Sequence, residues 1–277
     1  MKGPKLYILG AGKAEEMRLK RQIFALAPDS DALFDRIGIR QGEHVLDLGC
    51  GPGGVLHLLG KHVGPSGSVV AIDKNSRYVE LAREFVANSE LPQVEVRVGD
   101  AFDTGLPRAS FDGAHMRLLL SNVPEPEGAV KEMVSLVRPG GWVASFEADC
   151  LTHNCDPPHP AWRRLYDIFL TYSAMEGIDL FIGRRAHRLF RAAGIVDIRI
   201  DSVVHVYPPG HERRSLLLDF IYNIHDKLVE GGFAREAELA ADMAAVRRHL
   251  ADPNVIVTSH LFYRLSGRVP MEPAAFG

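Results

Sequence analysis

The stretch VLDLGCGPGGVL, residues 45–56, decides the fold of this chain. Its apolar beginning is typical of a buried strand, and glycines then occupy positions 49, 51, 53 and 54. Glycine has no Cβ and adopts positive φ readily, so such a turn lets the backbone approach a ligand closely. The spacing Gly49-x-Gly51-x-x-Gly54 fits a dinucleotide-binding turn. This pattern alone does not distinguish a nicotinamide cofactor from another nucleotide-like ligand.

Strands and helices alternate around this turn, which predicts a parallel sheet. The expected strands are 44–48, 68–73, 94–100, 111–117 and 142–149, and the expected helices are 52–62, 76–89 and 125–137, with a turn at 138–141. Two helices precede them, at 13–27 and from about 29, the second capped by Asp29 or Ser30. After residue 149 the pattern changes, with helices expected at 160–175, 184–193, 211–230 and 234–250 and strands at 196–207 and 254–268.

Composition and charge narrow the class of protein. The chain has 277 residues and a formal net charge of −3, which gives no basic footprint for nucleic acid. Its three cysteines are too few and too uneven for a disulfide framework, so a reducing cytoplasm is the expected compartment. No signal peptide and no apolar run of about 18 residues is present, so we expect no membrane partner.

Acidic residues occupy three consecutive strands at the glycine-rich turn. Asp47 lies inside the first strand, where it would repel a pyrophosphate but suit a ligand with a positively charged amino group. Asp73 ends the second strand, the position at which an acid can accept both hydroxyls of a ribose. Asp100 ends the third strand, where it can accept from an adenine amino group while the N–H of the next residues meets the ring. A single acid at a strand end is readily interpreted as a cap of the backbone. That interpretation does not account well for acids on three consecutive strands.

Five blocks within residues 44–147 together resemble the class I S-adenosylmethionine-dependent methyltransferases: VLDLGCGPGG, VVAIDKN, GDAFD, FDGAHMRLLL and LVRPGGWVASFE. The resemblance implies an α/β, Rossmann-like, doubly wound seven-stranded sheet with an antiparallel last strand, N-terminal helices and a helical lid insertion. It implies S-adenosyl-L-methionine as cofactor. The cofactor-binding residues that we predict are Tyr7, Arg18, Gln22, Asp47, Gly49, Gly51, Gly53, Asp73, Lys74, Asp100, Ala101, Phe102, Arg117 and Leu118.

The N-terminal pattern YILG…EEMRLKRQ is similar to a small-molecule branch of this family. In that branch an Arg and a Gln of the first helix approach the cofactor carboxylate. Arg18 and Gln22 lie four residues apart, hence on one helix face, and Arg grips carboxylates in bidentate fashion. Tyr7 is expected to cover the cofactor. Ordinary packing or a solvated helix is the competing interpretation of all three.

The chain is interpreted as a single methyltransferase domain with added segments. We expect an N-terminal helical cap at 1–42, a cofactor-binding core at 43–149, and substrate-covering insertions at 150–185 and 208–253. The insertions are apolar and aromatic, which suits a small hydrophobic acceptor. Residues expected to contact this substrate are Asn122, Asp149, Tyr172 and Tyr222. The N-terminal segment or the helical insertion is the expected surface for any homo-oligomer.

Two residues near the end of the fifth strand are candidates for proton transfer. The first candidate is His153, and the second is Glu147. His153 begins the stretch HNCDPPH, whose two prolines and lack of a second cluster of ligands argue against a metal site. The resemblance extends to quinone and sterol C-methyltransferases and to enzymes that tailor bacterial natural products, including indole alkaloids. It favours C- or N-methylation, for example of an indole or quinone-like ring. The alternatives are an NAD-dependent dehydrogenase, which leaves Asp47 and Asp100 unexplained, and a non-catalytic cofactor-binding module.

Overall fold

The computed structural model describes residues 7–10 and 12–271. The chain divides into two compact units. The larger unit comprises residues 19–147, 182–201 and 263–277, and the smaller comprises 1–18, 148–181 and 202–262. The predicted N-terminal cap, 1–42, is therefore shared between the units, and its residues 1–6 and 11 lie outside the described part. The predicted insertion at 208–253 belongs to the smaller unit, and the one at 150–185 belongs to it up to residue 181.

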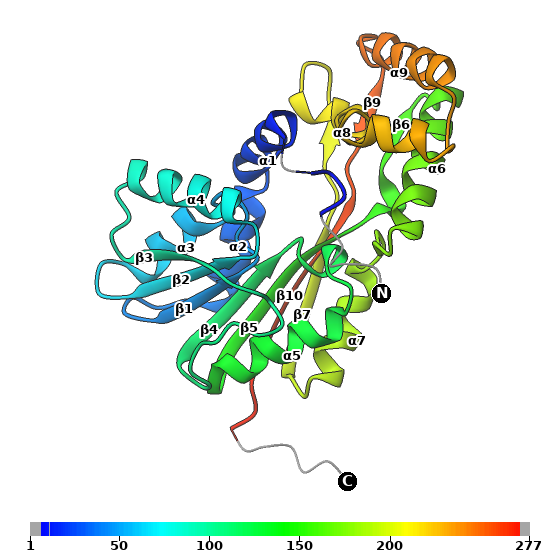
Figure 1. Cartoon of the computed structure of the whole chain (residues 1–277). Coiled ribbons are helices and arrows are strands. Elements are labelled where there is room, and N and C mark those ends of the chain that lie inside the picture. The colour runs from blue at the N-terminus through cyan, green and yellow to red at the C-terminus, as the bar shows by residue number, and fades with distance from the viewer. Residues whose placement is uncertain (1–6, 11, 272–277) are drawn as a thin grey trace. The chain divides into compact units, whose positions relative to one another are not determined.

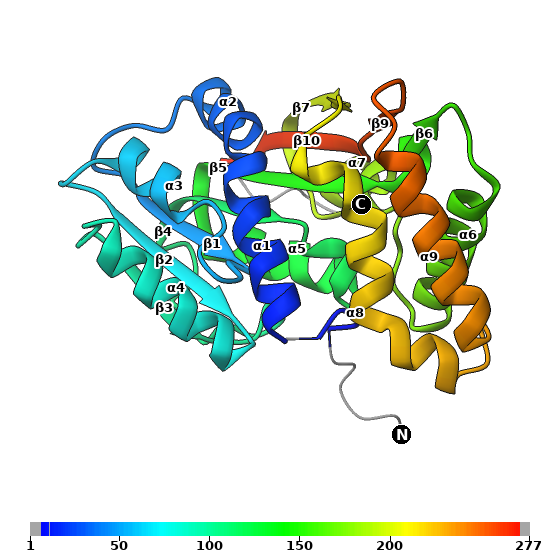
Figure 2. The same cartoon turned by 90° about the horizontal axis from the view of Figure 1, so that it is seen from above.

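A seven-stranded sheet, which lies mainly in the larger unit, confirms the predicted fold class (Figures 1 and 2). Strands β1 to β5 are parallel neighbours, and the last strand is antiparallel. The spatial order of the strands is β3 (Val94–Val98), β2 (Ser68–Asp73), β1 (His44–Leu48), β4 (Phe111–Arg117), β5 (Val137–Asp149), β10 (Leu261–Arg268) and β7 (Val196–Val203).

Helices cover both faces of this sheet because the central strands are apolar on both sides. One group is α2 (Ala27–Ile37), α3 (Leu56–Val63) and α4 (Ser76–Asn88); the other is α5 (Pro126–Leu136) and α7 (Gly183–Ala192) (Figure 1). Strand β1 presents Leu46 and Leu48 to the core that α5 and α7 share. The neighbouring side chain Asp47 therefore points to the opposite face, since strand side chains alternate.

Three local predictions need correction. Helix α3 begins at Leu56 rather than residue 52, because Gly53 and Gly54 have positive φ and keep the chain in a turn. Helix α2 begins at Ala27, with Pro28 in its first turn, where a missing N–H costs nothing, so Asp29 and Ser30 do not cap it. The predicted turn at 138–141 lies inside β5 as an irregularity in its pairing with β4.

The smaller unit is built around three helices and a small sheet. Helices α6 (Pro160–Met175), α8 (Leu216–Glu230) and α9 (Glu236–Leu250) pack against one another (Figure 2), and α6 has the bounds that the sequence predicts. The sheet has the order β6 (Asn154–Asp156), β9 (Ile256–Thr258) and β8 (Val206–Tyr207). Short 3-10 helices η2 (Cys150–Thr152) and η3 (Glu212–Ser215) belong to this unit, and η1 (Leu120–Asn122) to the larger one. Helix α1 (Lys13–Ala25) runs through both.

The small sheet arises because two predicted strands are each divided. The strand expected at 196–207 forms β7 and β8, and the strand expected at 254–268 forms β9 and β10. At the break, the Ser259 backbone N–H donates to the His205 carbonyl, and the His205 N–H donates to Ser259 Oγ. These hydrogen bonds join segments that are 54 residues apart, so no local pattern could have indicated the division.

Candidate functional site

Asp73 organises the glycine-rich turn after β1. Its Oδ2 accepts a hydrogen bond from the Gly51 backbone N–H at 2.8 Å, and its Oδ1 accepts from the Asn75 N–H at 2.8 Å. Burial raises the pKa of Asp73, and the two N–H groups oppose that effect. Each carboxylate oxygen keeps acceptor capacity beyond its one backbone donor. The acid at the end of β2 therefore holds the turn and can accept further hydrogen bonds beside it.

Two glycines of this turn, Gly49 and Gly53, combine a positive φ with close side-chain neighbours. A Cβ at Gly49 would lie 2.8 Å from the Leu119 side chain, and a Cβ at Gly53 would lie 2.8 Å from the Phe85 ring. Gly51 has a φ of +55°, and a Cβ placed there would meet nothing within 4 Å, so open space adjoins this residue. Side chains therefore pack against the turn at Gly49 and Gly53, whereas the space beside Gly51 is open. A turn whose backbone binds a ligand closely needs such an opening.

Asp100, at the end of β3, accepts two hydrogen bonds. Lys74 Nζ lies 2.8 Å from Oδ2, and the Phe102 backbone N–H lies 3.1 Å from Oδ1. The bond from Lys74 lowers the pKa of Asp100, which keeps it ionised. The structure therefore joins Lys74, Asp100 and Phe102, with Ala101 between the last two, in one cluster. Within this cluster, Lys74 holds the Asp100 carboxylate in place through its hydrogen bond to Oδ2.

Sequence reasoning missed the partner of Asp47. His115 of β4 faces it across the strand pair, and His115 Nδ1 lies 2.8 Å from Asp47 Oδ1. Both side chains are buried. The imidazole fixes the orientation of the carboxylate beneath the glycine-rich turn. The parallel register of β1 and β4 creates this pair, and the signal in the sequence is a histidine between the apolar residues Ala114 and Met116.

The loop after β4 brings three predicted residues together. Arg117 ends the strand and donates to Ser30 Oγ at 3.1 Å. Leu118 has a φ of +56°, and its carbonyl accepts from Asn122 Nδ2 at 2.8 Å. This compact loop turns the N–H groups of Leu119 and Leu120 toward Glu147 Oε1, each at 3.3 Å.

Glu147 is a fully buried carboxyl group near the end of β5. Its Oε1 also accepts from Ser145 Oγ at 3.2 Å, whereas Oε2 has no hydrogen-bond partner among the described residues. Burial raises the pKa of Glu147 to about 8, and the hydrogen bonds from Leu120, Ser145 and Leu119 limit the rise. At neutral pH the group is therefore mostly protonated and holds a proton that it can exchange. Perturbed carboxyl groups of this kind are typical of proton-transfer sites.

In the smaller unit, Arg18 takes part in a buried ion pair. Arg18 Nε and Nη2 donate to Glu15 at 2.7 and 2.6 Å, and Tyr7 Oη donates to Glu15 Oε1 at 2.8 Å. Asn223 of α8 completes the network with a 2.6 Å bond to Glu15 Oε2. Tyr7 and Arg18 thus come together around Glu15. Their binding of a cofactor carboxylate stays a prediction, as does that of Gln22, which the division of the chain assigns to the larger unit.

Replacing Asn223 with alanine should lower the free energy of unfolding by about 2 kcal/mol, because the buried Glu15 carboxylate loses a charge-assisted hydrogen bond. Urea unfolding followed by circular dichroism measures the change. Tyr222→Ala is the control on the same helix, since Tyr222 is 65% exposed and its loss should cost under about 0.5 kcal/mol. Equal effects of the two substitutions would contradict a stabilising role for the network.

His153 is buried among aromatic rings in the smaller unit. Neither ring nitrogen has a hydrogen-bond partner among the described residues, and burial lowers its pKa to about 3, with a further contribution from Arg213. An imidazole this weakly basic is a poor proton acceptor at neutral pH. The pKa values therefore favour Glu147 over His153 for proton transfer.

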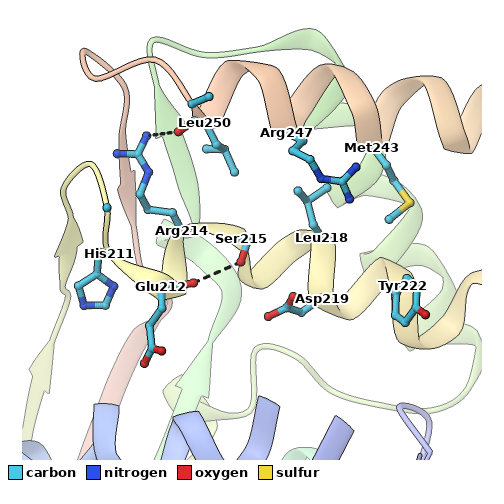
Figure 3. A pocket seen from close by; sticks show the side chains of 12 residues that line it. His211, Glu212, Arg214, Ser215, Leu218, Asp219, Tyr222, Met243, Arg247 and Leu250 are labelled. Carbon is cyan, nitrogen blue, oxygen red and sulfur yellow. Dashed lines mark hydrogen bonds between the residues drawn. The ribbon is translucent and has the colours of Figure 1, made fainter. Parts of the chain in front are cut away.

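The three remaining predicted substrate residues have separate environments. Asp149 caps η2 by accepting from the Leu151 N–H at 3.0 Å, and Tyr172 packs edge-on against Phe233 in the apolar core. Tyr222 is exposed at the rim of a pocket of about 540 Å³ (Figure 3). The lining residues are Gly210, His211, Glu212, Arg214, Ser215, Leu218, Asp219, Tyr222, Met243, Arg247, Leu250 and Ala251. Arg214 donates there to the Leu250 carbonyl at 2.8 Å. Substrate contact by these three residues stays a prediction.

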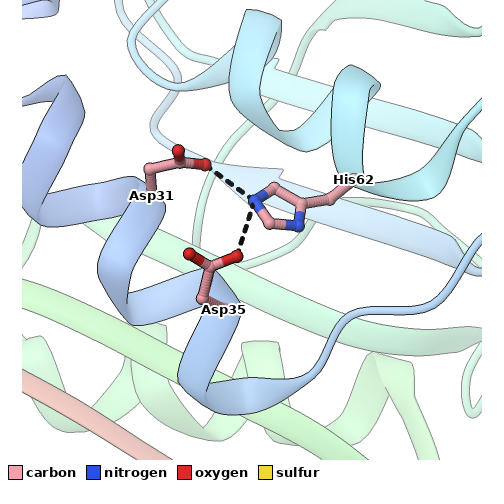
Figure 4. Close-up of side chains that lie close together, drawn as sticks. All are labelled: Asp31, Asp35 and His62. Carbon is pink, nitrogen blue, oxygen red and sulfur yellow. Dashed lines mark hydrogen bonds and ion pairs between the residues drawn. The ribbon is translucent and has the colours of Figure 1, made fainter.

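One group of side chains within residues 7–10 and 12–271 has the spacing of metal ligands. Asp31, Asp35 and His62 offer atoms within 4.8 Å of one another (Figure 4). His62 Nε2 lies 2.8 Å from Asp31 Oδ1, so the contact already ties α3 to α2 as an ion pair or hydrogen bond. Asp35 is largely exposed. The group lies outside the HNCDPPH stretch that the sequence analysis considered.

Comparisons with known proteins bear on the identity of the fold. Residues 45–141 match the family described as methyltransferase domain. An uncharacterized 37.1 kDa protein in transposon TN4556 of Streptomyces fradiae is 36% identical over 175 residues, covering 63% of this chain and 50% of that protein. Demethylmenaquinone methyltransferase of Lactobacillus johnsonii is 28% identical over 152 residues, covering 53% and 60%. The chain thus spans less than two thirds of the length of these relatives.

Solved structures support the fold alone. Phosphoethanolamine N-methyltransferase 2 of Haemonchus contortus has a TM-score of 0.56 at 18% identity, covering 87% of this chain and 52% of that one. The cyclase SpnF has a TM-score of 0.55 at 18% identity, covering 87% and 82%. Across the part of the chain that the structure describes, no helix combines the length and apolar character needed to cross a membrane.

Proposed function

We propose that the chain, whose residues 45–141 match a methyltransferase domain, is a class I S-adenosylmethionine-dependent enzyme that methylates a small, largely apolar or aromatic molecule. The observation that carries the proposal is the Asp73 carboxylate. It holds the glycine-rich turn through Gly51 and keeps acceptor capacity for a ribose. Asp47 and Asp100 lie at the adjoining strands of the same sheet.

The residues present fit this cofactor. The open side of Gly51 leaves room for the methionine part, Asp73 suits the ribose, and Asp100 keeps acceptor capacity for the adenine amino group beyond its bonds from Lys74 and the Phe102 N–H. Asp47, held by His115, supplies a negative charge for the amino group. When bound, the sulfonium supplies an activated methyl group. The protein then has to align a nucleophile with it and exclude water, and alignment alone gives effective molarities of ~10⁵ M or more.

Glu147 is the residue of the larger unit that we assign to proton transfer. A carbon or nitrogen acceptor loses a proton when it is methylated, and the minor ionised fraction of a carboxyl group with a pKa of about 8 can accept that proton near neutral pH. Its Oε2 has no hydrogen-bond partner in the described part of the chain, so that oxygen is the atom that would take the proton. The compact loop at Leu118–Asn122 holds Oε1 and keeps the group in place.

The acceptor class follows from the apolar content of the smaller unit. Its core gathers aromatic and aliphatic side chains from α6, α8 and α9. This composition suits an indole or quinone-like ring, and C- or N-methylation in natural-product metabolism is the activity we propose. A relative named demethylmenaquinone methyltransferase supports a ring acceptor. All three cysteines are free and buried, which suits a cytoplasmic enzyme.

Calorimetry with S-adenosylhomocysteine and with NADH tests the cofactor directly. We expect S-adenosylhomocysteine to bind with a micromolar dissociation constant, on the order of −8 kcal/mol, and NADH to give no heat of binding. Because a cyclase shares this fold, transfer must be tested as well, by release of S-adenosylhomocysteine in the presence of a naphthoquinol or an indole. Binding of NADH alone would overturn the proposal.

A further inference from the structure

The smaller unit contains a cluster of buried rings with unpaired nitrogen atoms. His153 follows η2 and His260 precedes β10, and their ring centroids lie 4.4 Å apart. Trp162 and Tyr166 of α6 contact His153 edge-on, with centroids at 5.2 and 5.6 Å. His153, His260 and Trp162 are 2%, 5% and 2% exposed, so water reaches none of them freely.

The polar atoms of this cluster lack partners. Within the described residues, no hydrogen bond reaches either ring nitrogen of His153, Nε2 of His260 or Nε1 of Trp162. Buried polar atoms in folded proteins are nearly always paired with protein, ordered water or a ligand, because each unmet group is costly. Four such atoms on three touching or neighbouring rings therefore indicate a polar guest at this place.

The surroundings restrict the guest to a flat, mostly apolar molecule. Phe220 and Phe262 flank His260, each with ring centroids 6.1 Å away. The Tyr166 hydroxyl already donates to the Cys150 carbonyl, so it adds an apolar ring face rather than a free polar group. An aromatic guest can pack against these rings, and only one of its substituents needs to be polar.

We propose that His153, His260 and Trp162 form a subsite that binds the hydroxyl group of an aromatic methyl acceptor. This inference rests on the proposed function and names its substrate class. Trp162 offers an N–H donor, and a neutral imidazole offers one donor and one acceptor. A hydroxyl group accepts two hydrogen bonds and donates one, so it can pair with three of the four atoms, whereas a carbonyl oxygen leaves the imidazole acceptor unpaired. His153 then recognises the acceptor rather than removing its proton.

Phenol and toluene are the probes, because they have nearly the same shape and differ in the hydroxyl group. The chain, labelled with ¹⁵N, is titrated with each probe in the presence and in the absence of S-adenosylhomocysteine and followed by NMR. The Trp162 indole N–H signal, one of two in the chain, and the His153 ring nitrogens report the site. We expect phenol to shift these signals and to bind about tenfold more tightly than toluene.

Variants test which side chains cause the preference. His153→Phe and His260→Phe keep an aromatic ring, so we expect toluene binding to persist while the preference for phenol falls to about one. His187→Phe, on α7 in the larger unit, is the matched control and should keep the preference. Equal binding of phenol and toluene to the unmodified chain, no phenol-dependent shift, or an unchanged preference in both variants would each overturn the subsite.

The two proposals fail separately. If S-adenosylhomocysteine binds but phenol is not preferred, the methyltransferase assignment stands and the hydroxyl subsite is wrong. If phenol is preferred through His153 but S-adenosylhomocysteine does not bind, the subsite stands and methyl transfer is wrong.

Discussion

Replacing Asp73 with alanine is expected to raise the dissociation constant for S-adenosylmethionine about 100-fold. Two ribose hydroxyls lose a charged acceptor, and each hydrogen bond to a charged group contributes about 1.5–3 kcal/mol. The Gly51 and Asn75 N–H groups lose their acceptor at the same time, so the turn itself is also released. Isothermal titration calorimetry with S-adenosylmethionine or S-adenosylhomocysteine measures the change.

Two further variants separate the roles of Asp73. Asp73→Asn keeps one oxygen but places an amide donor opposite a backbone N–H, so we expect a loss close to that of alanine. Glu80→Gln on α4 changes an exposed acid on the element after Asp73 and should leave the dissociation constant unchanged. An unaltered affinity in Asp73→Ala, or an equal loss in Glu80→Gln, would remove Asp73 from the binding site.

The gathering of three acids beside the glycine-rich turn was predictable from the sequence because its parts are local. Each of Asp47, Asp73 and Asp100 lies within a few residues of a strand end that apolar runs mark clearly. Once the strands are parallel and adjacent, their carboxyl ends share one edge of the sheet, so the three acids need no further information to come together. The glycine-rich turn adds its own conformational signal at Gly49, Gly51 and Gly53.

Long-range pairs were not predictable for the opposite reason. The Glu15–Asn223 bond joins residues 208 positions apart, and the Asp47–His115 pair joins residues 68 apart. The Glu15–Arg18 ion pair, by contrast, is local, because the two residues lie three positions apart on α1. The division at His205 and Ser259 likewise depends on contacts between distant segments.

The sequence identified Glu147 as a candidate for proton transfer, but it could not predict that this carboxyl group has a raised pKa. Its raised pKa comes first from complete burial in the sheet, against which the backbone N–H groups of Leu120 and Leu119 and the Ser145 hydroxyl act. Those donors belong to a loop 27 and 28 residues away and to a strand neighbour. Sequence position identifies the carboxyl group, and only the fold supplies its environment.

In the unmodified chain, the free energy of unfolding should fall as pH rises, because Glu147 loses its proton. We expect Glu147→Gln to abolish this part of the pH dependence. The folded-state pKa of about 8 exceeds the unfolded value of 4.5, so between these limits the folded chain binds a proton that the unfolded chain releases. Its free energy of unfolding therefore falls with rising pH, by up to about 1.4 kcal/mol per pH unit from this group. Glutamine resembles the protonated acid in shape and does not titrate. Relative to the unmodified chain, the variant should gain about 4 kcal/mol between pH 5 and pH 8.

Urea unfolding of both proteins at pH 5, 6, 7 and 8 measures this gain, and taking the difference between them cancels the titration of all other groups. Glu132→Gln is the matched control, because Glu132 is also buried but carries the opposite shift. Burial acts to raise the pKa of Glu132, but the hydrogen bonds from Arg108 and Thr104 outweigh this effect and lower the pKa below its usual value. Glu132 is therefore ionised in both states above pH 5, and its difference from the unmodified chain should stay constant over that range. A constant difference for Glu147→Gln as well would mean that Glu147 is ionised in the folded chain at pH 5 and that burial does not raise its pKa.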